Sequence, residues 1–186
     1  MKSNGIKNST MRIAVCGVIS ALSLALMLLT GLVPVGTYAF PCFAGILLAA
    51  IVIEYKWKWA LLVYAVVSAL SLFLANDKEA VVFFIMLFGY YPTLKNLIES
   101  KLQPKFGKLA GYIIKFLIFN ASAVAAFFIT TFLLAIPAEE YTLFGFYVPW
   151  VFLIIGNTFF LIYDYAISVF AAQYVCRLRN KIFRKK

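Results

Sequence analysis

Residues 13–53 read IAVCGVISALSLALMLLTGLVPVGTYAFPCFAGILLAAIVI and contain no charged side chain of either sign. Further uncharged runs cover residues 59–76, 80–94, 116–138 and 141–163. A helix needs roughly 20 apolar residues to cross a hydrocarbon layer about 30 Å thick, and most of these runs are of about that length or longer. The pattern predicts a chain that crosses a membrane several times as helices.

The composition agrees with lipid as the main solvent. Of the 186 residues, 65% are hydrophobic and 13% are charged, and the mean hydropathy is +0.96. A soluble domain of this length could not bury so much apolar surface. The apolar runs are continuous and do not alternate as membrane strands do, which favours helices over a barrel. We therefore expect an all-α integral membrane protein that forms one domain over residues 1–186.

Six spans account for the sequence, at about residues 11–32, 40–53, 58–75, 79–98, 109–136 and 147–175. Pro34 and Gly36 end the first span, and Pro41 falls close to the first turn of the second, where proline is tolerated. Asn76 or Asp77 is a suitable N-cap for the fourth. The basic start resembles a signal peptide, but the apolar run after it is too long, so we expect a retained helix.

The cationic side chains predict the orientation. Fifteen of the seventeen Lys and Arg residues fall in the N-terminal segment, the two connections around 56–58 and 95–108, and the C-terminal tail. By the positive-inside rule both termini are cytoplasmic, and the loops 33–39, 76–79 and 137–146 face outward. The stretch 100–108 is expected to be a solvated loop, with a segment lying on acidic lipid or docking a cytoplasmic partner as the alternative.

Several classes of function have no support in the residues. The net charge of +10 is scattered over loops and one tail, so no nucleic-acid partner is expected. Histidine is absent, and Cys16, Cys42 and Cys176 are far apart, so we expect neither a metal site nor a cofactor. No Ser/His/Asp set and no glycine-rich phosphate loop are present, which predicts a protein that is not an enzyme.

Small residues recur every four positions in the first span, at Gly17, Ala21 and Ala25. They lie on one helix face and allow another helix backbone to approach closely, which is how helices associate in lipid. The face is either a docking surface for another membrane protein or a packing surface for the second or sixth span of this chain.

Asp164 is the one acidic residue deep within a span, at about 16 Å from the expected end of the last helix. Such a charge normally faces the bundle interior and has a partner. Lys115 of the fifth span is expected at about 9 Å depth, with its side chain extending toward Asp164, and Asn120 near the level of Asp164. We therefore predict a polar cluster of these three residues. It is either a structural clamp or part of a coupling or substrate pathway, and Lys115 could instead extend to the cytoplasmic surface.

The outward loops contain groups that recognise small molecules. Aromatic side chains at this level often form an interfacial belt, but aromatic planes with a few hydrogen-bonding groups also form ligand pockets. The candidate substrate-binding residues are Tyr38, Phe40, Asn76, Glu79, Tyr141, Tyr147, Trp150 and Asn157.

The chain resembles the substrate-binding S components of energy-coupling factor (ECF) vitamin transporters in length, span number, topology and its basic start, Arg12-IAVCGVISALSLA-25. In that family an Ala-x-x-x-Ala element of the first helix docks a transmembrane coupling subunit, and Ala21 and Ala25 match it. The vitamin binds at the outward end, which implies that the aromatic-rich mouth is the pocket. No motif for one particular vitamin is present.

The resemblance implies a subunit of the bacterial cytoplasmic membrane that captures a vitamin-like molecule and works with a coupling subunit and two ATPases. Two alternatives stay open from the residues. One is a small membrane scaffold similar to the rod-shape protein MreD, without a ligand pocket. The other is a stand-alone carrier that uses an ion gradient through the Asp164 cluster.

Overall fold

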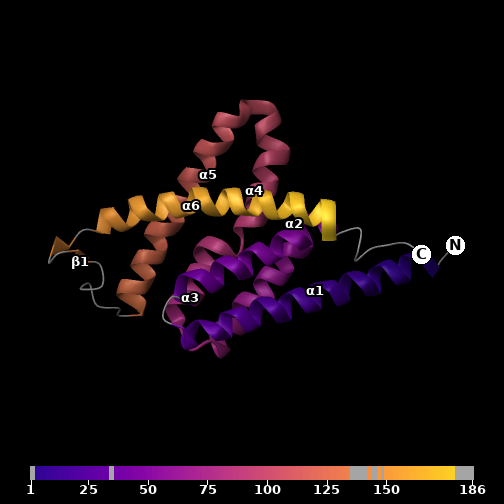
Figure 1. Ribbon diagram of the computed structural model, residues 1–186, viewed down its shortest axis with the longest axis horizontal. Coiled ribbons are helices and arrows are strands. Elements are labelled where there is room, and N and C mark those ends of the chain that lie inside the picture. The colour runs from indigo at the N-terminus through magenta and orange to yellow at the C-terminus, as the bar shows by residue number, and fades with distance from the viewer. Residues whose placement is uncertain (1–2, 34–35, 135–141, 144–145, 148, 179–186) are drawn as a thin grey trace.

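The computed structural model describes residues 3–33, 36–134, 142–143, 146–147 and 149–178, and nearly all of them are helical. The α-helices are α1 (Ser3–Leu29), α2 (Gly36–Leu74), α3 (Lys78–Phe83), α4 (Tyr91–Leu97), α5 (Gln103–Phe128) and α6 (Pro149–Gln173) (Figure 1). Shorter helical turns extend them: a 3-10 turn at Thr30–Leu32 and π turns at Phe84–Phe88, Ile98–Leu102, Ile129–Leu133 and Tyr174–Leu178. The two-residue strands β1 (Thr142–Leu143) and β2 (Phe146–Tyr147) pair in antiparallel fashion.

Four helical segments in the described part of the chain are long and apolar enough to cross a membrane. They are Ser9–Leu32, Gly36–Leu74, Lys78–Leu133 and Leu153–Cys176. The expected helical fold is confirmed at this level, with four long segments in place of six separate spans. Two of the four contain 39 and 56 residues, and both are interrupted.

The interruption in α2 is at Lys56, which has φ 70° and ψ 170°. A residue that carries a Cβ rarely adopts this left-handed backbone conformation. The position coincides with the expected boundary between the spans 40–53 and 58–75. Buried residues from both halves of α2 belong to one hydrophobic cluster, so the chain folds back on itself at this single residue.

The start of α2 differs from the expectation. The helix begins at Gly36 rather than at residue 40, and Pro41 lies inside it. Pro41 has no backbone N–H, so the helix lacks the hydrogen bond from position 41 to the carbonyl of Thr37 in its first turn. Because only this one bond is missing, the helix continues through the proline.

The segment 78–133 begins as expected and then differs. Asp77 is the N-cap of α3, since its Oδ1 accepts from the backbone N–H of Ala80 at 2.9 Å, which confirms that expectation. The predicted solvated loop 100–108 is wrong, because a π turn and the first turn of α5 occupy it. Within α5 only Gly107 leaves helical geometry, with φ 85°. The chain reverses there because glycine adopts this conformation without steric cost.

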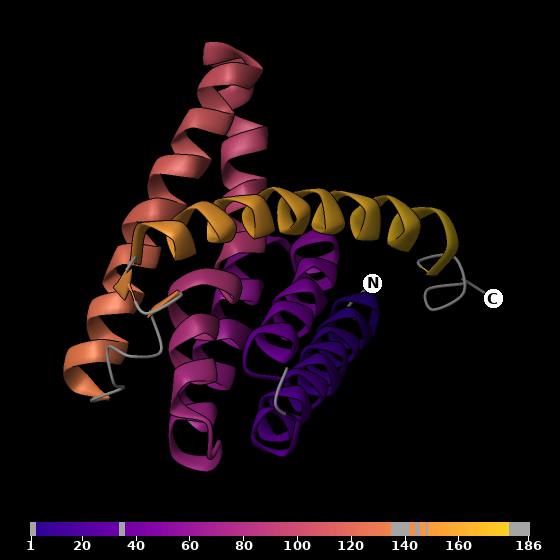
Figure 2. The same ribbon diagram turned by 60° about the vertical axis from the view of Figure 1, so that its left-hand side comes forward.

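Helix α2 packs against α1, α3, α4 and α6, and α6 runs across the hairpin of α4 and α5 in both views (Figures 1 and 2). The first helix lies beside α2, and the hairpin of α4 and α5 extends away from α1. Helix α1 begins and helix α6 ends toward the same side of the molecule. At the opposite side α1 ends, and α2 and α3 begin.

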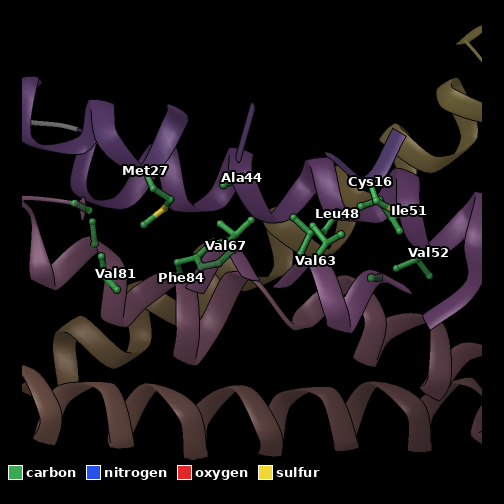
Figure 3. Close-up of a cluster of buried hydrophobic side chains, with 13 residues drawn as sticks. Cys16, Met27, Ala44, Leu48, Ile51, Val52, Val63, Val67, Val81 and Phe84 are labelled. Carbon is green, nitrogen blue, oxygen red and sulfur yellow. The ribbon is translucent and has the colours of Figure 1, made fainter. Parts of the chain in front are cut away.

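Two buried clusters hold this arrangement together. The first joins α1, both halves of α2, and α3 with its π turn, through residues that include Met27, Leu48, Val63, Val81 and Phe84 (Figure 3). The second joins α2, α4, α5 and α6 through Ala49, Tyr91, Phe119, Phe160, Tyr163 and Ile167. The stacked rings of Phe119 and Phe160, 4.4 Å apart, pack α5 directly on α6.

Gly45 allows the close approach at the junction of these clusters. A Cβ on Gly45 would collide with the hydroxyl of Tyr163 and would lie 2.5 Å from the carbonyl oxygen of Phe88. Those two groups form a hydrogen bond of 3.0 Å to each other, with Tyr163 donating. Added volume on α2 therefore disturbs both the packing and a buried polar contact.

We expect Gly45→Ala to destabilise the protein by about 1–3 kcal/mol, because the crowded site has no space for the methyl group. Gly17→Ala is the matched control: a Cβ there meets nothing within 4 Å, so it should be neutral or stabilising by up to about 1 kcal/mol. Thermal unfolding in detergent measures both. Equal effects of the two substitutions would contradict this packing.

Candidate functional site

A groove lies where α1 ends and α2 and α3 begin. It has a volume of about 440 Å³ and is lined by Thr30, Gly31, Leu32, Val33, Thr37, Asn76 and Asp77. The groove is formed by three chain segments, namely the 3-10 turn after α1, the first turn of α2 and the turn between α2 and α3. Val33 and Thr37 belong to the predicted outward loop 33–39, and Asn76 and Asp77 belong to the predicted outward loop 76–79.

Hydrogen bonds fix the polar wall of this groove. The hydroxyl of Thr37 donates to Oδ2 of Asp77 at 2.7 Å, while Oδ1 of the same carboxylate caps α3. The ammonium of Lys78 donates to the carbonyls of Leu72 and Ala75, at 2.7 and 2.8 Å, and so closes the end of α2. Asp77 and Lys78 therefore hold the turn in place, and the exposed side chain of Asn76 is presented beside Gly31.

Tyr38 and Glu79 lie next to the groove. The Tyr38 hydroxyl donates a long hydrogen bond of 3.4 Å to Oε1 of Glu79. The ring of Tyr38 is 5.1 Å from the ring of Phe83 and is largely exposed. Phe40 is half-buried, with its ring against Gly36 at the start of α2. Four of the candidate substrate-binding residues thus lie in or near one region: Tyr38, Phe40, Asn76 and Glu79.

Of the other candidate substrate-binding residues, only Asn157 has a described side chain, and it does not line this groove. Tyr141 lies outside the described residues, and only the backbone of Tyr147 and Trp150 is described, in β2 and at the start of α6. Asn157 lies between α5 and α6 and forms a reciprocal amide pair with Asn120, at 2.9 and 3.0 Å. Each of the two amides also donates to the carbonyl four residues before it.

This pairing corrects the expectation that Asn120 belongs to the Asp164 cluster. Asn157 precedes Asp164 by seven residues, or about 10 Å along a helix axis. Lys115 is the α5 residue that meets Asp164, and Asn120 lies five residues further along α5, where it faces Asn157. The facing amide offers Asn120 both a donor and an acceptor, which is the partner that an amide in lipid needs.

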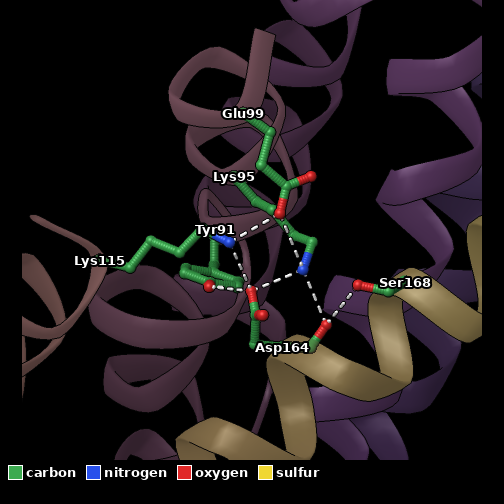
Figure 4. Close-up of polar contacts among 6 residues, drawn as sticks. All are labelled: Tyr91, Lys95, Glu99, Lys115, Asp164 and Ser168. Atoms are coloured by element: carbon green, nitrogen blue, oxygen red, sulfur yellow. Dashed lines mark hydrogen bonds and ion pairs between the residues drawn. The ribbon is translucent and has the colours of Figure 1, made fainter. Parts of the chain in front are cut away.

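A separate cluster of charges surrounds Asp164 (Figure 4). One oxygen of its carboxylate, Oδ1, accepts from the Tyr91 hydroxyl at 2.5 Å, from Lys95 at 2.6 Å and from Lys115 at 3.1 Å. Lys95 also donates to the main-chain carbonyl of Asp164 at 2.9 Å. The donors come from α4 and α5, and the acceptor comes from α6, so the cluster ties three helices together.

Glu99 completes the cluster. Its Oε1 lies 2.7 Å from the ammonium of Lys115 and 3.3 Å from that of Lys95. The side chains of Lys95, Lys115 and Asp164 are 6%, 0% and 9% exposed, whereas that of Glu99 is 40% exposed. Two ammonium groups and two carboxylates therefore alternate in a closed ring that is electrically balanced, and one carboxylate reaches the surface.

Sequence reasoning placed some of these residues and missed others. The structure brings Lys115 and Asp164 together, so Lys115 does not extend to the surface. Lys95 was counted with the cytoplasmic connection, but it is buried in the cluster. Tyr91, Lys95 and Glu99 recur every four residues and lie on one helix face. That spacing next to an uncharged run is the signal that could have found them.

The small residues of α1 lie on its outer face. Gly17, Ala21 and Ala25 are exposed, while the opposite face buries Cys16, Ser23 and Met27. Packing against α2 or α6 of the same chain, the alternative use of this face, is thus not what the structure shows. The three small residues leave a shallow strip at which another backbone can approach.

Asp164→Asn should destabilise the protein by about 3–5 kcal/mol, because it leaves two buried ammonium groups with a single carboxylate. Adding Lys115→Met removes the excess charge, so the double variant should recover much of the loss. Thermal unfolding in detergent of both single variants and the double variant measures the coupling. Additive losses would show that the two side chains do not interact in the way the geometry indicates.

Comparisons of the chain with protein-family models, curated proteins and solved structures found no match.

Proposed function

We propose that the chain is the membrane-embedded, substrate-binding subunit of an ATP-driven importer of the ECF type, which captures a vitamin or similar small molecule. The observation that carries this proposal is the exposure of Gly17, Ala21 and Ala25 along α1. The resemblance assigns the docking of a coupling subunit to this stretch. An intramolecular use of the same face would have left it covered.

The proposed topology has six crossings with both termini in the cytoplasm of a bacterial cell. It divides α2 at Lys56 and the long segment 78–133 at Gly107. At 1.5 Å per residue, the 39 residues of the Gly36–Leu74 segment extend over about 58 Å, nearly twice the hydrocarbon thickness. Two crossings with a reversal between them match that length better than one crossing does.

The groove at the end of α1 is the proposed substrate entrance. It combines a threonine hydroxyl, the exposed Asn76 amide and the adjacent Tyr38 ring, which are groups that bind neutral polar molecules with an aromatic or planar part. Because Asp77 and Thr37 already bond to each other, they pre-organise the wall. The docking face and this groove then belong to the same helix, with the groove at its end.

The partners in this proposal are a transmembrane coupling subunit and two ATPase subunits. The chain supplies binding and docking, and ATP hydrolysis takes place on the ATPases. A scaffold similar to MreD would use the exposed α1 face as well, but it would need no ligand groove. A stand-alone carrier would use the Asp164 cluster, whose charges are already balanced within the protein, as in a structural clamp.

Replacing Ala21 and Ala25 together with Leu should abolish uptake and association with the ATPase module, since bulky side chains keep the partner backbone away. Ligand binding to the isolated subunit should persist. Ala121→Leu is the matched control, because Ala121 is also exposed in the apolar part of a helix, α5. Uptake assays and co-purification of the module measure the effects. Unchanged uptake in the Ala21/Ala25 variant would refute the docking role.

A small molecule should co-purify with the chain and be visible by mass spectrometry. Asn76→Ala should reduce its affinity about 2- to 10-fold, as expected for one lost hydrogen bond. Lys105→Ala, a change of an exposed residue on the α4–α5 hairpin, should leave the affinity unchanged. Absence of any bound molecule, in cells that supply vitamins, would favour the scaffold over the importer.

A further inference from the structure

The charge cluster reaches the surface through Glu99 alone among its charged members. Lys95, Lys115 and Asp164 have side chains exposed by 9% or less, while 40% of Glu99 is accessible. Glu99 lies in the π turn Ile98–Leu102, at the outer end of α4. The ring therefore has two anionic positions: Asp164 occupies the buried one, and Glu99 occupies the one at the protein surface, which forms the rim of the cluster.

The rim position must hold a negative charge. Two ammonium groups next to Asp164 alone would leave one buried positive charge without compensation, which costs several kcal/mol even after relaxation. The oxygen at this position, Oε1 of Glu99, meets both ammonium groups. The geometry thus defines a place where one oxygen of an anion bridges Lys95 and Lys115.

The two lysines differ in how fully the protein satisfies them. Each ammonium has three donors. Lys95 directs its donors at Oδ1 and the carbonyl of Asp164 and at Glu99. Lys115 contacts one oxygen of Asp164 and one of Glu99, and it lies 5.0 Å from the centre of the Tyr112 ring. An aromatic face attracts a cation but supplies no oxygen, so Lys115 has capacity for an anion with more than one oxygen.

The surroundings favour anions. Lys101, Lys105 and Lys108 are exposed on the same hairpin, the first two before the reversal at Gly107 and the third directly after it. Exposed lysines close together raise the local concentration of phosphate-bearing groups, either free in solution or on anionic lipids. Tetrahedral phosphate offers several oxygens to two ammonium groups, whereas the side chain of Glu99 offers one to both.

We propose that Lys95 and Lys115 form a binding site for one phosphate group entering at the rim, and that Glu99 is the built-in occupant that such a group displaces. The site lies in the hairpin of α4 and α5 and is separate from the groove at the end of α1. Its assignment does not depend on the importer proposal. The phosphate group belongs either to a free anion or to the headgroup of an anionic lipid.

Glu99→Gln tests the proposal, because it keeps the side-chain shape and removes the competing charge. The purified full chain in detergent is heated in inorganic phosphate and in chloride at equal ionic strength. At phosphate concentrations ten times the dissociation constant, the Tm of the variant should rise by about 3–6 °C over its value in chloride. Wild-type protein should show a smaller rise, since Glu99 competes.

Two further variants locate the effect. Adding Lys115→Met to Glu99→Gln should abolish the phosphate response, because the bridging donor is lost. Adding Lys58→Met should leave it intact, since Lys58 is an exposed lysine on another part of the chain. A response that survives Lys115→Met, or its absence in a folded Glu99→Gln protein for both phosphate and anionic lipid, overturns the proposal.

Native mass spectrometry separates the two sources of phosphate. If a lipid headgroup is the occupant, the Glu99→Gln protein retains phosphatidylglycerol in preference to phosphatidylcholine, and Lys115→Met removes the preference. If a free anion is the occupant, inorganic phosphate alone raises the Tm. Should the Glu99→Gln protein be recovered unfolded from chloride, purification in phosphate or with phosphatidylglycerol must restore folding, and failure to do so refutes the site.

Discussion

A single carboxylate oxygen, Oδ1 of Asp164, receives hydrogen bonds from residues of two other helices. In an apolar interior no water is present to accept hydrogen bonds from these donors. The helices that supply them must therefore stay next to Asp164. The path of α6 across the bundle follows from this requirement. The aromatic contacts of Phe160 with Tyr91, Phe116 and Phe119 then fill the space that the charged groups define.

The helical fold could be predicted because it depends on the composition of long stretches of the sequence. Uncharged runs identify helices in lipid regardless of which neighbours they meet, and the boundary near Lys56 follows from a pair of lysines between two runs. Lys115 and Asp164 were paired correctly because an acid deep within a span needs a partner and the long side chain of a lysine inside the next span can reach it.

Details that depend on which face of a helix a residue occupies were harder to predict from the sequence. Lys95 was missed because a lysine at the edge of a run is usually a surface residue, and only the position of α6 makes it internal. Asn120 was assigned to the wrong partner because the register between α5 and α6 depends on the side chains at their contact, which the positions of the span ends do not give. The groove at the end of α1 joins segments far apart in the chain, and its lining by Thr30, Thr37 and Asp77 could not be inferred from any one of them.

The reversal of α2 uses one residue, Lys56, where most helical hairpins use several. Such a short connection holds the two arms of α2 side by side, and buried residues of both arms pack in one cluster. The first arm packs on α1 and the second carries the turn that leads to α3. The reversal at Lys56 thus brings both ends of one helix to the same groove, with Thr37 at the start of α2 and Asn76 and Asp77 directly after its end.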